Sequence, residues 1–128
     1  MAERPAPTEH YARIALRARI EGAGPHELIA ILYEELLAAM DAMTAFGRRG
    51  DRAGHARSRA RALTALHGLD SGLDPAAGGA LAANLASIYG RARRVIGDHA
   101  VGPECAGISG MRSTLAEIAT AWRGIGAR

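Results

Sequence analysis

The chain has 128 residues, a formal net charge of +3 and one cysteine, Cys105. This length favours a single domain with its own core, and a single cysteine excludes an internal disulfide and suits a reducing cytosol. No apolar run approaches the roughly 20 residues needed to span a bilayer, and residues 1–7 lack the apolar core of a secretory signal.

The charge pattern bears on nucleic-acid binding. All sixteen basic residues are arginines, spread along the chain among thirteen acids. A phosphate-binding protein usually gathers its basic residues on one face. We therefore interpret these arginines as a solvated helix surface and keep nucleic-acid binding as a less favoured alternative.

The N-terminal residues divide into a tail and a short helix. Residues 1–10 contain two prolines and no apolar pattern, so we expect a disordered tail ahead of one helical domain over 11–128. Within 11–21, Tyr11 and Ile14 share a face with Ala15 and Ala18, which predicts a weakly amphipathic helix lying back on the domain. A membrane-surface or targeting role is the less favoured alternative.

Residues 25–46 form the most apolar stretch of the chain and predict its central helix. Pro25 suits a first helical turn, and Glu27 follows within that turn, where the helix dipole favours negative charge. Apolar residues at spacings of three and four form a continuous seam: Ile29, Leu32, Leu36, Ala39, Met43 and Phe46. A second row widens the apolar face: Leu28, Ile31, Tyr33, Leu37 and Met40. We therefore expect this helix to contact partners on more than one side.

Three further helices follow with short connections. Asp51 and Asp74 are placed as N-caps, the latter before Pro75. Seams continue through the third helix (Ala62, Leu66, Leu69, Leu73), the fourth (Leu81, Leu85, Ile88, Ala92, Val95) and the last (Ile108, Met111, Leu115, Ile118, Trp122, Ile125). Unbroken spacing predicts that Leu85 and Leu115 are buried, and the mid-helix Gly90 predicts a close approach by another group.

These patterns predict an all-α fold, an antiparallel up-and-down four-helix bundle preceded by a short N-terminal helical segment. No alternating run indicates a strand. Short connections favour antiparallel neighbours, and no second domain or internal repeat is apparent.

The residues that could carry chemistry show no spacing typical of an active site. The five histidines form no metal-site pattern, and we expect no catalytic residue, metal or cofactor. Cys105 at a helix start is interpreted as a bystander thiol. His67 or His99 could be the acceptor of a phosphotransfer bundle, which leaves a regulatory, protein-interacting bundle as the alternative function.

Several spaced motifs together resemble the family of flagellar secretion chaperones known as FliS. The first is Pro25-x-Glu27-Leu28-Ile29-x-x-Leu32-Tyr33-x-x-x-Leu37, preceded by Tyr11; the others are Leu69-Asp70-x-x-Leu73-Asp74, Gly78-Gly79, Leu81-x-x-Asn84-Leu85-x-x-Ile88-Tyr89, Arg93-Arg94-x-Ile96 and Leu115 with Trp122-Arg123. The resemblance covers about residues 11–125. The chain departs from the family pattern at Gly24, where a capping serine is usual, and in its more basic charge.

The resemblance implies a cytosolic, non-enzymatic chaperone. Its client would be the C-terminal segment of flagellin, held back from polymerising before export, with other flagellar export or regulatory proteins as further partners and with no membrane insertion. We expect a monomer or weak homodimer. An apolar helical groove would bind the client, and the candidate client-binding residues are Tyr11, Ile14, Leu28, Tyr33, Leu37 and Tyr89. We further expect Tyr11 and Ile14 to cover part of this groove until client displaces them.

Overall fold

The computed structural model describes residues 7–102 and 106–126, and every regular element within these ranges is a helix. The helices are α1 (Pro7–Gly22), α2 (Pro25–Arg48), α3 (Arg52–Ser71), α4 (Pro75–Asp98) and α5 (Ala106–Gly126). None of them is long and apolar enough to cross a membrane. The predicted Cys105 helix start lies outside the described residues.

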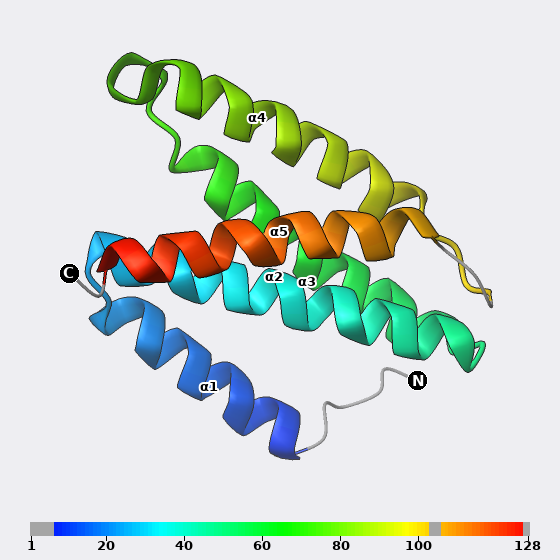
Figure 1. Cartoon of the computed structure of the whole chain (residues 1–128). Helices are drawn as coiled ribbons and strands as arrows, with labels where there is room; N and C mark the ends of the chain where they lie inside the picture. Colours follow the sequence, from blue (N-terminus) through cyan, green and yellow to red (C-terminus); the bar gives the residue numbers. More distant parts are fainter. Residues whose placement is uncertain (1–6, 103–105, 127–128) are drawn as a thin grey trace.

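Helices α2 to α5 run alternately up and down, which confirms the predicted all-α antiparallel bundle (Figure 1). α2 is central: it packs most extensively against α3 and also contacts α5. α4 packs against α3 and, less closely, against α5. α1 diverges from the start of α2, so that its N-terminal end stands away from the other helices (Figure 1).

The helix boundaries follow from local capping chemistry. The Asp51 carboxylate accepts a hydrogen bond from the Gly54 backbone N–H at 2.9 Å, and the Asp74 carboxylate accepts from Ala76 and Ala77. Each cap satisfies backbone donors that have no partner inside the helix. Gly50, with φ of +72°, lies just beyond the end of α2, in a conformation that favours glycine. The predicted caps at Asp51 and Asp74 are thereby confirmed.

The core lies between α2, α3, α4 and α5. Most of its buried side chains come from the predicted seams and from the second row of α2: Tyr33, Leu36, Met40, Met43, Leu66, Leu69, Ile108 and Leu115. In α4 the large buried residues are Tyr89 and Ile96, each one position after a predicted seam residue (Ile88, Val95) that is only half-buried. The prediction that Leu115 is buried is confirmed. The second row is therefore not a free surface, since Tyr33 and Met40 already belong to this core.

The first half of α4 departs from the prediction. Gly79 has φ of +53°, which kinks α4 one turn after its start, and Leu81 lies in the first turn after this kink and is 66% exposed. Leu85, predicted to be buried, is only half-buried at the edge of the core. Gly90 has no group within 4 Å of the position of a Cβ, so the predicted close approach is wrong for the described chain.

α1 is longer than predicted. It begins at Pro7, so residues 7–10, assigned above to the tail, are helical, while residues 1–6 lie outside the described residues. The exposed side chains of Arg19 in α1 and Glu34 in α2 form an ion pair at 2.9 Å, which joins the two helices. Such a surface pair contributes at most about 1 kcal/mol, so α1 is held to the bundle weakly.

Candidate functional site

The outward face of α1 is an exposed apolar surface. Tyr11 and Ile14 are 70% and 52% exposed and lie one helical turn apart on the same face. The half-buried Leu16 lies on the opposite side of the helix, since successive residues turn by about 100°. Leu16 therefore faces the bundle and Tyr11 and Ile14 face away from it. The expectation that these two side chains cover a groove in the free protein is wrong for this structure.

The C-terminal end of α1 lies close to the start of α2 and to the end of α5. Glu34 accepts from Arg19 of α1 at 2.9 Å and from Arg123 of α5 at 3.4 Å. Nearby, the Trp122 indole N–H donates to the His26 carbonyl at 2.9 Å, and the Trp122 ring stacks on the His26 ring. These contacts join the C-terminal parts of α1 and α5 to the first half of α2, at the end of the bundle where α1 and α2 meet (Figure 1).

Leu28 and Leu37 of α2 are both half-buried, but they do not line one groove. They are nine residues apart, which places them about 180° apart around the helix axis. Leu37 packs against the core cluster, whereas Leu28 lies near the start of α2 and outside that cluster. Of the two, Leu28 is nearer in sequence to the C-terminal end of α1.

Tyr33 and Tyr89, expected in the groove, lie instead inside the core. Each is 2% exposed, and their hydroxyl groups share a hydrogen bond of 2.5 Å between α2 and α4. Burial raises the pKa of both phenols above the ordinary value. In this structure the pair holds α4 to α2 and offers no surface to a partner.

A buried polar network that the sequence did not reveal joins the start of α3 to the segment after α4. His55 and His99 stack, and His55 Nε2 lies 2.6 Å from His99 Nδ1. Arg59 Nη2 donates to the His99 carbonyl at 2.6 Å and lies 3.3 Å from His55 Nδ1. A guanidinium can only donate, so His55 Nδ1 accepts and His55 Nε2 carries the proton donated to His99.

This network favours neutral histidines. Burial lowers the pKa of both imidazoles, and the Arg59 charge lowers them further, as does His99 in the case of His55. A buried His99 is also unsuited to accept a phosphoryl group, whereas His67, the other candidate acceptor, is exposed on α3. Among the described residues, no three His, Cys, Asp or Glu side chains are grouped as metal ligands.

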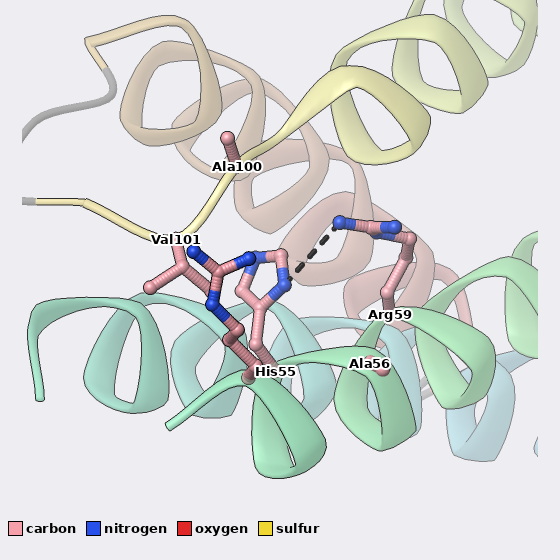
Figure 2. Close-up of a pocket in the computed structure, with 6 residues that line it drawn as sticks. His55, Ala56, Arg59, Ala100 and Val101 are labelled. Atoms are coloured by element: carbon pink, nitrogen blue, oxygen red, sulfur yellow. Dashed lines mark hydrogen bonds between the residues drawn. The ribbon is translucent and has the colours of Figure 1, made fainter. Parts of the chain in front are cut away.

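A pocket of about 380 Å³ opens beside this network. It is lined by Arg52, His55, Ala56, Arg59, Ala100 and Val101. Figure 2 shows the Arg59 and His55 side chains lying toward each other on α3, with Ala100 and Val101 on the segment that follows α4. The pocket is thus formed by elements more than 40 residues apart, which no local sequence pattern indicates.

Comparison with known proteins gives two matches over most of the chain. The family model described as flagellar protein FliS matches residues 7–128. The flagellar secretion chaperone FliS of Salmonella typhimurium is 28% identical over 116 residues, which is 90% of this chain and 86% of that protein.

Proposed function

The chain belongs to the FliS family of flagellar proteins, and we propose that it is a cytosolic export chaperone that binds the C-terminal segment of flagellin. The matched relative is itself a flagellar secretion chaperone. The match to the family model over residues 7–128 is the observation that carries the proposal, since it includes α1 and the complete bundle.

The exposed apolar face of α1 supports a client-binding role. An apolar pair such as Tyr11 and Ile14, more than half exposed, is stabilised when a partner removes it from water. A client segment that forms an amphipathic helix could lay its apolar face along the exposed apolar face of α1. We propose that the docking surface includes Tyr11 and Ile14 and continues beyond the C-terminal end of α1 to Leu28 in α2.

The remaining candidates take different parts in this proposal. Leu37 packs against the core on the side of α2 opposite Leu28, so it lies outside this docking surface. Tyr33 and Tyr89 do not touch the client in this proposal; their buried hydroxyl contact holds α2 to α4 within the bundle. The weak attachment of α1, through Arg19 and Glu34, lets the helix close on a client without breaking the core.

The expected energetic contribution of the α1 face can be worked from its exposure. Fully burying a side chain of this size is worth about 1.5–3 kcal/mol, so burying the exposed half contributes about 1 kcal/mol for each residue. Replacing both Tyr11 and Ile14 by serine is therefore expected to weaken binding by about 2 kcal/mol, or roughly 30-fold. Neither residue packs in the core, so folding is expected to be unchanged.

Isothermal titration with a synthetic flagellin C-terminal segment tests both the client and its location. Wild type is expected to bind with one-to-one stoichiometry and little dependence on salt, because apolar burial dominates the interaction. The matched control is Leu81→Ser, which removes a side chain of similar exposure from α4 and is expected to bind as wild type. If wild type gives no heat in this titration and no chemical-shift change in NMR spectra with the same segment, flagellin is refuted as the client. Ile14→Ser alone is expected to weaken binding by about 1 kcal/mol, so equal losses in Leu81→Ser and Ile14→Ser would refute the location on α1.

A further inference from the structure

The pocket between α3 and the segment after α4 gathers basic side chains from the start of α3. Several arginines elsewhere on the surface meet carboxylates directly: Arg61 pairs with Glu35, Arg93 with Asp70, and Arg112 forms two hydrogen bonds with Asp41. Two arginines and a histidine line this pocket, and none of the described residues lining it is acidic. The carboxylate next to it in sequence, Asp51, is engaged in capping α3.

Arg59 is held in position and keeps donors to spare. Its Nη2 contacts the His99 carbonyl and His55 Nδ1, which fix the side chain against the pocket wall. Its Nε–H is buried and has no hydrogen-bond partner within the described chain. A buried donor without a partner costs about 1–3 kcal/mol, so a ligand that supplied an acceptor to this guanidinium would be favoured.

The other walls of the pocket strengthen this preference. Ala56, Ala100 and Val101 contribute apolar side chains, so they bring no side-chain acceptor that would compete with an anion for the guanidinium groups. His55 has both ring nitrogens committed, one to Arg59 and one to His99, so it positions Arg59 and leaves the ligand to the two arginines. A volume of about 380 Å³ admits a small ligand and not an extended one.

We propose that this pocket is a binding site for a small oxyanion, held between the guanidinium groups of Arg52 and Arg59. Planar guanidinium groups match the geometry of oxyanions and bind them through charge-assisted hydrogen bonds. The oxyanion could come from free phosphate or from a carboxylate of a bound protein. This site is separate from the client-docking surface on α1 and does not depend on the proposed chaperone function.

Titration of the full-length protein with inorganic phosphate, sulfate and acetate, each against chloride at equal ionic strength, tests the site. Backbone amide shifts in NMR spectra are expected to saturate and to be confined to residues 52–59 and 99–101. Saturation with phosphate or sulfate alone identifies free phosphate as the source. Saturation with acetate, alone or together with phosphate and sulfate, shows that the site also accepts a carboxylate. In either case the oxyanion site is supported.

Two arginine variants separate this site from general charge effects. Arg52 is exposed and lies outside the histidine network, so Arg52→Gln removes a ligand donor without disturbing the fold. It is expected to weaken binding about tenfold, the loss of one charge-assisted hydrogen bond. Arg57→Gln, the same charge change on an exposed position of α3 outside the pocket, is expected to leave affinity unchanged. The proposal would be overturned if the oxyanions gave the same amide shifts as chloride, or if Arg52→Gln and Arg57→Gln lost the same amount of affinity.

Discussion

The buried His55–His99 pair makes the stability of the bundle sensitive to mild acid. Burial, with the charge of Arg59, lowers the pKa of both imidazoles in the folded protein. In the unfolded chain a histidine titrates near pH 6.5. Because the folded-state pKa is lowered, the stabilisation is present above the unfolded value and is lost as pH falls through it toward the folded value.

The contacts indicate why the folded pair resists protons. A proton on His55 Nδ1 would displace the contact with Arg59 and place two positive charges 3.3 Å apart. A proton on His99 Nδ1 would remove the acceptor of the 2.6 Å bond to His55. The unfolded state binds each of these protons freely, so each histidine contributes a slope of up to about 1.4 kcal/mol per pH unit below pH 6.5. The loss by about pH 5.5 is therefore at most about 1.4 kcal/mol per histidine.

Urea unfolding followed by far-ultraviolet circular dichroism, at several pH values between about 7.5 and 5.5, measures this loss. His99→Gln is expected to be less stable than wild type at neutral pH, because it breaks the buried network. Its stability is also expected to fall less steeply with pH, because it carries one fewer imidazole with a lowered pKa. The control His67→Gln removes an exposed imidazole from α3 and leaves the pair intact. It is expected to retain the wild-type slope. Parallel pH profiles for wild type and His99→Gln would refute the reasoning.

Two further predictions concern packing, and both are measured as free energies of unfolding in urea. Leu115→Ala is expected to cost about 2–5 kcal/mol of stability, because Leu115 is fully buried. Leu85→Ala is expected to cost less, because Leu85 is only half-buried. Equal costs for the two variants would contradict this difference in burial. Gly54→Ala is expected to cost about 1–3 kcal/mol, because its Cβ would lie 2.5 Å from Cδ1 of Phe46. Gly90→Ala, with open space at that position, is instead expected to add about 0.5–1 kcal/mol. A destabilised Gly90→Ala would show that a group does approach this glycine.

The sequence alone determined that the chain forms helices, where α3 and α4 begin, and that successive helices of the bundle run antiparallel. Asp51 and Asp74 cap helices through hydrogen bonds that reach two or three residues along the chain, so the capping residue and its donors are visible together. Apolar spacing of three and four marks the buried side of a helix in the same local way. Leu115 was therefore correctly predicted to be buried, and the family motifs, which are also local patterns, were confirmed by the match to residues 7–128.

The candidate site depended on contacts between distant segments, and there the sequence was insufficient. Spacing marks a side chain as apolar but not which helix faces it, so it could not show that Tyr33 binds Tyr89, 56 residues away. It also could not show that the apolar face of Tyr11 and Ile14 turns outward. His55 and His99 are 44 residues apart, and only the antiparallel return of α4 brings their rings together. Local hydrogen bonds and periodicity fix each helix, whereas the rotation of one helix against another is set by the packing of all of them at once.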